Sequence, residues 1–196
     1  MQINHLNLSF KKRLAANCAV LNRNAQSDEP CSIYRILPDE DADYFTKLRK
    51  DENWKNSEFL EFAIYELPYL KRDNRYEMYS IENKDGNCLG FAEIEKGKDF
   101  VQIQSLETAP KFANSKKSKY RYIGETFVAF STKIAQLLNK PILRVNPAED
   151  AIDFYSQKCG MDYDEDRVIC ELHQDQYHDL LSQNVRHTGR SIEIVA

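Results

Sequence analysis

The pattern of apolar and polar positions predicts a chain that alternates between strands and helices from residue 31 onward. Short apolar or alternating runs predict strands at 31–37, 76–82, 88–95, 99–106, 141–145 and 168–172. Helical spacing, or the start and stop signals of helices, predicts helices at 39–49, 57–67, 124–139, 146–160 and 174–182. Turn residues at 83–87 predict a hairpin between two of the strands. This order of elements is that of an α/β protein.

The first thirty residues stand apart from this pattern and predict an N-terminal appendage, helical or flexible. Apolar residues recur there at helical spacing behind Ser9, a candidate helix cap: Phe10, Leu14, Cys18 and Leu21. A basic stretch without acids is also typical of an organellar presequence. Residues 26–30 have the composition of a linker. We therefore expect an appendage at 1–30, one domain at 31–185 and a C-terminal tail at 186–196.

The net charge of the chain is unevenly distributed. The whole chain carries −4, but the residues before Asp28 hold four bases and no acid, so the remainder carries −8. An acidic body argues against nucleic acid as the principal partner, because phosphate binding needs clustered Lys and Arg. It is compatible with an amine substrate. The apolar runs are too short to span a bilayer, so we expect no membrane partner.

Five cysteines are dispersed along the chain without a C-x-x-C pair, and the four histidines show no zinc-ligand spacing. Small buried thiols in a reducing compartment explain this usage best. We expect a cytoplasmic protein without a metal site.

The connection between the strand predicted at 99–106 and the helix predicted at 124–139 has the features of a phosphate site. Residues 108–124 contain five bases and no acid, and a helix is predicted to begin near Gly124. The first amide groups of a helix have no intrahelical acceptor and carry partial positive charge, so they bind phosphate. Glycine there allows a ligand to approach the backbone closely. A diphosphate site and an ordinary solvated basic loop both remain open at this point.

Three segments resemble, in order, motifs of the GNAT N-acetyltransferase superfamily. Leu106 to Pro110 resembles its Leu-x-Val-x-Pro strand, and Arg121 to Thr126 resembles its Arg/Gln-x-x-Gly-x-Gly/Ala acyl-CoA pyrophosphate loop. Asn146 to Met161 resembles its Asn-x-x-Ala…Phe-Tyr-x-x-x-Gly-Phe segment. The resemblance covers residues 31 to about 172. It implies a mixed, mostly antiparallel sheet, splayed at its central strands and flanked by helices, in the domain at 31–185. Two departures are Thr126, where Gly or Ala is usual, and a longer loop between Pro110 and Arg121.

The resemblance implies acetyl-CoA as the acyl donor and assigns residues to it. Backbone groups of Leu106 and Thr108 would pair with the pantetheine arm, and Asn146 would bond the arm from the opposite side. The pyrophosphate would lie on the segment formed by Arg121, Tyr122, Ile123, Gly124, Glu125 and Thr126. Lys119 and the lysines before it, from Lys116 on, would reach the outer phosphate.

Two side chains are the candidate catalytic groups. In the superfamily the residue that matches Tyr155 protonates the departing thiolate, so the resemblance implies that the Tyr155 hydroxyl is the general acid. The amine must lose its proton before it attacks, and Glu107, at the end of a strand, is the candidate base. Glu93 and Glu95 on the preceding strand are alternatives.

The sequence therefore predicts an acetyl-CoA-dependent N-acetyltransferase in which an amine attacks the thioester directly. A catalytically silent module of the same fold, which binds CoA or a protein partner, is the alternative. A nucleic-acid-associated protein that uses the basic arm and loop is a second alternative, disfavoured by the acidic body. The acceptor, a small-molecule or peptide amine, and the oligomeric state, monomer or homodimer, stay open.

Overall fold

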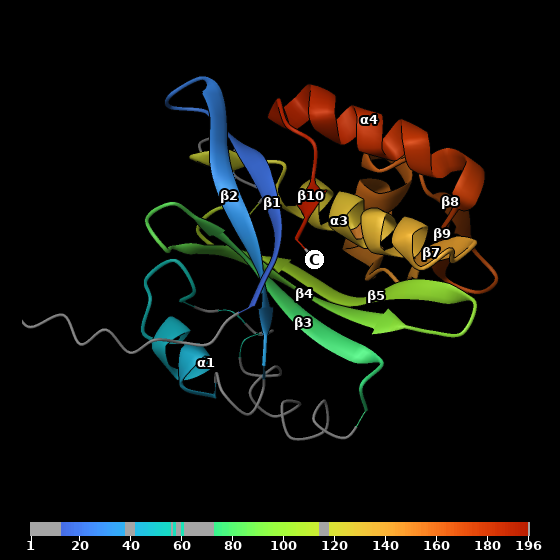
Figure 1. Cartoon of the computed structure of the whole chain (residues 1–196), viewed down its shortest axis with the longest axis horizontal. Helices are drawn as coiled ribbons and strands as arrows, with labels where there is room; N and C mark the ends of the chain where they lie inside the picture. The colour runs from blue at the N-terminus through green and yellow to red at the C-terminus, as the bar shows by residue number, and fades with distance from the viewer. Residues whose placement is uncertain are drawn as a thin grey trace, which may run out of the picture.

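The computed structural model describes residues 13–37, 42–55, 57, 60, 73–113 and 118–195. The strands are β1 (Arg13–Asn22), β2 (Ser27–Ile36), β3 (Tyr76–Asn83), β4 (Cys88–Lys96), β5 (Phe100–Thr108), β6 (Tyr120–Arg121), β7 (Ile142–Val145), β8 (Asp162–Asp164), β9 (Ile169–His173) and β10 (Glu193–Ile194). The helices are α1 (Ala42–Leu48), α3 (Ile123–Leu137) and α4 (Tyr177–Thr188), with short helical turns η1 (Glu149–Ala151), η2 (Phe154–Lys158) and η3 (Gln174–Gln176). Figure 1 shows their arrangement.

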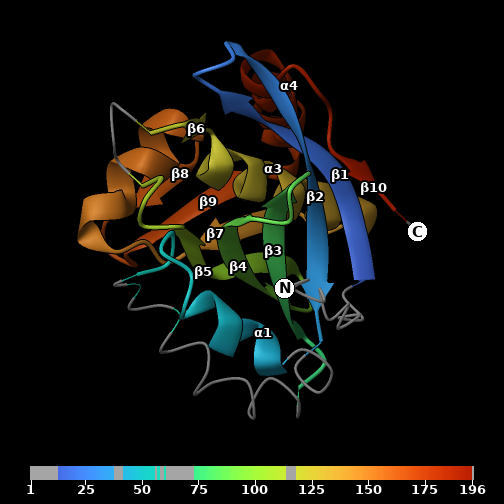
Figure 2. The same ribbon diagram turned by 90° about the vertical axis from the view of Figure 1, so that its left-hand side faces the viewer.

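The ten strands of the described part form one sheet in the order β10-β1-β2-β3-β4-β5-β7-β9-β8, and β6 pairs with β1. Every pair is antiparallel except β5 with β7, which is parallel. In Figure 2, α1 lies below the sheet and α3 and α4 lie above it. The expected fold class, a mixed and mostly antiparallel sheet flanked by helices, is confirmed.

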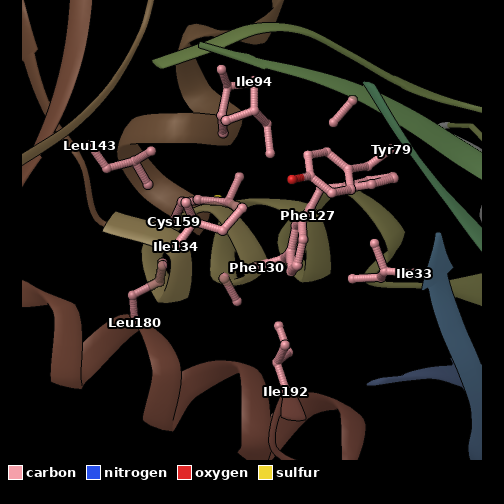
Figure 3. Packing of buried hydrophobic residues seen from close by; sticks show 14 of the residues in the cluster. Ile33, Tyr79, Ile94, Phe127, Phe130, Ile134, Leu143, Cys159, Leu180 and Ile192 are labelled. Carbon is pink, nitrogen blue, oxygen red and sulfur yellow. The ribbon is translucent and has the colours of Figure 1, made fainter. Parts of the chain in front are cut away.

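The larger apolar core lies between the sheet and α3. Phe127, Phe130 and Ile134 follow one another on α3 at spacings of three and four, so they share one face of the helix. They meet strand residues such as Tyr79 and Ile94, as Figure 3 shows. A second core on the opposite face joins α1 to the sheet, with the Phe91 ring among its aromatic side chains. Burial on both faces fixes the sheet between two helical layers.

Local sequence signals predicted most of the central elements. The three consecutive strands at 76–82, 88–95 and 99–106 are confirmed as β3, β4 and β5, and the helix at 124–139 as α3. The expected hairpin joins β3 and β4. Gly86 adopts a left-handed conformation there (φ 78°), and the Asn83 side chain accepts hydrogen bonds from the amides of Asp85 and Asn87.

The helix predicted at the N-terminus is wrong for the residues that the structure describes. Residues 13–22 form β1, which pairs with β2 from Arg13 opposite Arg35 to Asn22 opposite Ser27. The predicted linker at 26–30 belongs mostly to β2. Ala16, Cys18 and Val20 alternate into the core, so the buried face follows the two-residue period of a strand. Both strands lie in the same sheet as the rest of the chain.

The other differences lie toward the C-terminus. The helix predicted from residue 146 starts later, as η1, and continues into the π-helical turn η2 before Gly160 ends it (φ 66°). The predicted C-terminal tail contains the end of α4 and the strand β10, which pairs with β1.

Residues 1–12 and nearly all of the helix predicted at 57–67 lie outside the described residues. Among the described helices, none is long and apolar enough to cross a membrane.

Candidate functional site

A cavity of about 840 Å³ lies where β5 ends and α3 begins. Its volume falls within the range of small-molecule and cofactor sites, roughly 300–1,000 Å³. The walls come from the end of β5, the segment after it, β6 with the start of α3, and the turns η1 and η2. The lining residues are Leu106, Glu107, Thr108, Pro110, Phe112, Ala113, Ser118, Tyr120, Arg121, Tyr122, Ile123, Gly124, Glu125, Asp150, Ala151 and Phe154.

The sheet is splayed beside this cavity, as expected. Strand β5 pairs with β7 only over Phe100–Ile103, opposite Ile142–Val145. Beyond Ile103, β5 continues to Thr108 and stays paired with β4 on its other side, while β7 ends at Val145. The end of β5 thus leaves the parallel ladder at the point where Leu106 and Thr108 enter the cavity wall. A strand edge of this kind can pair with an extended ligand.

The first turn of α3 forms the adjoining wall. The first intrahelical hydrogen bond runs from the amide of Thr126 to the carbonyl of Tyr122 (2.9 Å), so three amides precede it at the helix start. Tyr122 itself adopts a left-handed conformation (φ 66°), which turns the chain sharply from β6 into the helix. Tyr122, Ile123, Gly124 and Glu125 all line the cavity. The positive end of the helix dipole therefore faces this space.

Gly124 keeps the helix backbone accessible. A Cβ atom at this position would lie 3.0 Å from Cζ of Phe154 and 3.7 Å from Cδ2 of Leu106. Both of these side chains line the cavity, so an added methyl group would enter its floor. At this position glycine relieves close packing against Phe154, and its backbone conformation makes no special demand.

A histidine on α4 contacts the start of α3. Arg121 is exposed and lines the cavity. The Glu125 carboxylate, the acid of the first turn, lies 2.7 Å from Nδ1 of His187 on α4. The His187 ring also stacks on the ring of Tyr122, with centroids 4.5 Å apart and an angle of 15°. One histidine therefore contacts both the residue before the helix and the acid within its first turn.

Glu107 is the carboxylate that the β4–β5 hairpin brings to the cavity. Glu107 lines the cavity, and its Oε2 accepts a hydrogen bond from the Ser57 hydroxyl (2.7 Å). The alternatives do not line it: Glu93 accepts a hydrogen bond from Ser105 (3.2 Å), and Glu95 accepts one from Gln104 (2.6 Å). Of the three candidate bases, geometry favours Glu107.

Eight of the predicted site residues line the cavity: Leu106, Glu107, Thr108, Arg121, Tyr122, Ile123, Gly124 and Glu125. Three other predicted residues, Lys119, Thr126 and Asn146, do not. Thr126 is buried, and its hydroxyl donates to the carbonyl of Tyr122 (2.8 Å), as a helical threonine commonly does. Asn146 accepts a hydrogen bond from the Gln102 side chain (3.0 Å), and the Lys119 amine lies over the Tyr120 ring. Lys116 lies outside the described residues.

The structure also does not bring Tyr155 to the cavity; its neighbour Phe154 lines it instead. The Tyr155 side chain is 6% exposed and belongs to the main core. Burial raises the pKa of its hydroxyl, and the nearby thiols of Cys159 and Cys170 raise that pKa further. The role of Tyr155 as a catalytic acid stays a prediction that this geometry does not support.

The spacing of the motif gives a physical reason. Four residues separate Tyr155 from Gly160, whereas the superfamily pattern has three. The helical turn accommodates the extra residue as a π-turn, in which the Cys159 amide donates to the carbonyl of Phe154, five residues back (3.1 Å). One inserted residue changes which side chain of the turn meets the cavity. The sequence analysis did not predict Phe154 as a lining residue of the cavity. The extra residue between Tyr155 and Gly160 is the sequence signal that could have indicated it.

Among the described residues, no group of three or more His, Cys, Asp or Glu side chains could hold a metal ion. The lining offers backbone amides, a strand edge, one arginine (Arg121) and three carboxylates (Glu107, Glu125 and Asp150).

No protein-family model and no curated protein matches the sequence. The fold does match solved structures. A proposed acetyltransferase of the GNAT family from Desulfovibrio desulfuricans aligns with a TM-score of 0.54 at 12% identity, over 73% of this chain and 98% of that one. PaiA N-acetyltransferase from Thermoplasma acidophilum, solved with coenzyme A, gives 0.50 at 15% identity, over 73% and 98%. A chimera of the spermidine N-acetyltransferase SpeG from Vibrio cholerae and hSSAT gives 0.53 at 13% identity, over 76% and 98%. The chain has the fold of the GNAT acetyltransferases.

Proposed function

We propose that this protein is an acetyl-CoA-dependent N-acetyltransferase that transfers an acetyl group to a primary amine by direct attack on the thioester. One observation carries the proposal: the splayed end of β5 and the first turn of α3 border the same cavity. A chain with the GNAT fold thus has a strand edge for an extended arm and a helix start for phosphate in one continuous space. Neither feature alone would specify a ligand.

The lining fits the donor in chemistry and in space. The amides of Ile123, Gly124 and Glu125 and the guanidinium of Arg121 would hold the pyrophosphate, because helix starts and arginine both bind phosphate. The backbone of β5 at Leu106 would pair with the pantetheine arm. When bound, acetyl-CoA supplies the activated acyl group. The absence of a side chain at Gly124 leaves room that a Cβ atom would fill.

Glu107 is the proposed base for the acceptor. It lines the cavity, and the Ser57 hydroxyl fixes one of its oxygens. A primary amine is mostly protonated near neutral pH and has no lone pair in that form, so a carboxylate that accepts its proton makes attack possible. Glu93 lies on the same face of the sheet, because Ser105, two residues before Glu107 on β5, bonds to it. Two carboxylates on this face suit a cationic acceptor, so a screen of amines starts with polyamines such as spermidine.

The test has two stages. Acetyl-CoA, CoA and dephospho-CoA are titrated against the protein in a thermal-shift assay, and free-thiol release is then measured across polyamines, amino acids, peptides and amino sugars. Acetyl-CoA at a hundredfold excess over its dissociation constant should stabilise the fold by about 2.7 kcal/mol. Arg121→Ala should weaken binding, whereas Arg167→Ala, on the exposed turn after β8, should not. No shift with acetyl-CoA at millimolar concentration would refute the proposal.

A silent module that binds CoA is the second candidate, and the position of Phe154 favours it. The phenol expected to protonate the departing thiolate lies in the core, and a phenylalanine lines the cavity in its place. This candidate predicts the same thermal shift with acetyl-CoA but no thiol release above the hydrolytic background with any amine. The thiol-release stage therefore separates the two candidates.

A further inference from the structure

A second cavity, of about 660 Å³, lies at the opposite ends of α3 and β1 from the candidate acetyl-CoA cavity. It shares no lining residue with that cavity. Its walls come from the C-terminal half of α3, the start of β1, the ends of β2 and β4, and β10. The lining residues that matter here are Leu14, Arg35, Lys96, Leu137, Leu138 and Val195. Nothing in the proposed reaction uses this space.

The walls hold most of the exposed apolar surface in the described part of the chain. Among all described residues, six large apolar side chains are exposed. Four of these six line this cavity: Leu14 (39%), Leu137 (57%), Leu138 (43%) and Val195 (40%). Exposed apolar side chains scattered singly are ordinary, but a cluster that lines a hollow marks a binding site. The volume lies within the range of small-ligand pockets.

One side of the same cavity is positively charged. Arg35 lies 2.9 Å from one oxygen of Glu77, and the Lys96 amine contacts the other oxygen. The Tyr79 hydroxyl donates a hydrogen bond to Glu77 as well. Two cations thus share a single buried carboxylate, and Arg13 adds a third, exposed cation to the lining. Arg35 and Lys96 are partly exposed, so each can turn further donors toward a ligand.

We propose that this cavity binds an amphipathic carboxylate: an unbranched aliphatic chain that ends in a carboxylate group. The aliphatic chain packs on Leu137, Leu138 and Val195, and the carboxylate group meets Arg35 and Lys96, whose combined charge exceeds that of Glu77. Charge decides between this ligand and an aliphatic amine of equal length. A carboxylate offsets the excess positive charge, whereas an ammonium group adds to it.

The chain length of the ligand provides a measurable signature. Hexanoate, octanoate, decanoate and dodecanoate are titrated into the full-length protein by calorimetry, below their micelle concentrations and without acetyl-CoA. Each further buried methylene group should raise the affinity about fourfold until the cavity is filled. Decanoate should bind with a stoichiometry of one, and decylamine should bind at least ten times more weakly. An affinity that does not change with chain length, or equal binding of decylamine, would overturn the proposal.

Matched variants separate this site from general adsorption. Leu137→Gln and Lys96→Gln should each weaken decanoate binding about tenfold or more. Two exposed positions outside the cavity serve as controls: Val185→Gln on α4 for the apolar substitution and Lys98→Gln for the charge substitution. Sedimentation velocity without ligand tests the other occupant of an apolar hollow, a second copy of the chain. A dimer that Leu137→Gln dissociates would overturn the small-ligand proposal.

Discussion

Gly124→Ala tests whether the start of α3 is a ligand surface or only a helix end. The substitution adds one methyl group at the second residue of the helix. The backbone φ there lies outside the left-handed region, so alanine can adopt the same backbone conformation. The new Cβ atom would lie 3.0 Å from Cζ of Phe154. Ordinary carbon contacts are about 3.5–4.0 Å, so the ring must shift by about half an ångström. Phe154 borders the open cavity and has space to move.

The expected effects on folding and on binding differ in size. Alanine is the better helix former by about 1 kcal/mol, which offsets the cost of moving Phe154, so the free protein should melt within about 4 °C of the wild type. A phosphate kept away from the amides near residue 124 loses charge-assisted hydrogen bonds worth about 1.5–3 kcal/mol each. The dissociation constant of acetyl-CoA should therefore rise at least tenfold. At a concentration one hundred times the wild-type constant, stabilisation by acetyl-CoA should fall from about 2.7 to about 1.4 kcal/mol.

A thermal-shift titration of acetyl-CoA, with and without the substitution, measures both quantities. Gln136→Ala, at an exposed position near the other end of α3, is the control for helix propensity and should leave binding unchanged. If Gly124→Ala binds acetyl-CoA with the wild-type constant, the helix start does not contact the phosphates. A variant that loses binding only because it unfolds would show a lowered melting temperature without ligand, which separates that outcome from a direct effect.

Four further predictions follow from the same geometry. Glu107→Gln keeps the size of the side chain but removes its charge. Turnover in the thiol-release assay should therefore fall at least a hundredfold, while the acetyl-CoA dissociation constant stays within twofold. Equal losses in turnover and in acetyl-CoA affinity would contradict the role of Glu107 as the general base. Tyr155→Phe should change turnover by less than about threefold, because the hydroxyl lies in the core, and a hundredfold loss would show that it reaches the thioester. His187→Gln removes the imidazole that contacts Glu125 near the proposed phosphate position. Acetyl-CoA binding should therefore weaken about threefold at low salt. An unchanged dissociation constant would show that the His187–Glu125 contact does not affect acetyl-CoA binding. Burial raises the pKa of Cys31 to about 12, and all five cysteines are buried, so the native protein should react slowly with a thiol reagent at pH 8 and release five equivalents only after denaturation.

Elements with a strong local signal were predictable from the sequence. The hairpin between β3 and β4 follows from turn residues whose side chains and backbone make the turn themselves, and α3 follows from a wide apolar face. Strand β1 was not predictable in this way, because the spacing of Leu14, Cys18 and Leu21 suits a helix. Its strand conformation is set by backbone pairing with β2 along its whole length, together with short ladders to β6 and to β10, which lies more than 170 residues away. Two-residue strands such as β6 carry no local pattern at all.

The site divides along the same line. The residues that contribute backbone, from Leu106 to Thr108 and from Tyr122 to Glu125, could be found because a motif fixes the positions of main-chain groups. The residues expected to contribute side chains depend on rotation about a helix or strand: Glu107 and Arg121 line the cavity, whereas Tyr155 and Asn146 do not. In η2, which holds one residue more than the motif and forms a π-helical turn, Tyr155 lies in the core and Phe154 lines the cavity.

The N-terminal strand also bears on the site, although the sequence set it apart as an appendage. Strand β1 pairs with β6, which places Leu21 opposite Arg121 and Asn22 opposite Tyr120. The buried Glu29 carboxylate on β2 accepts a hydrogen bond from the Asn22 side chain (2.5 Å) and one from the Tyr120 hydroxyl (3.3 Å). These bonds fix the segment that carries the Arg121 side chain to the cavity. A buried carboxylate costs free energy unless its oxygens accept hydrogen bonds, so the Glu29, Asn22 and Tyr120 side chains hold one another in place. Strand β1 thereby positions the proposed phosphate loop.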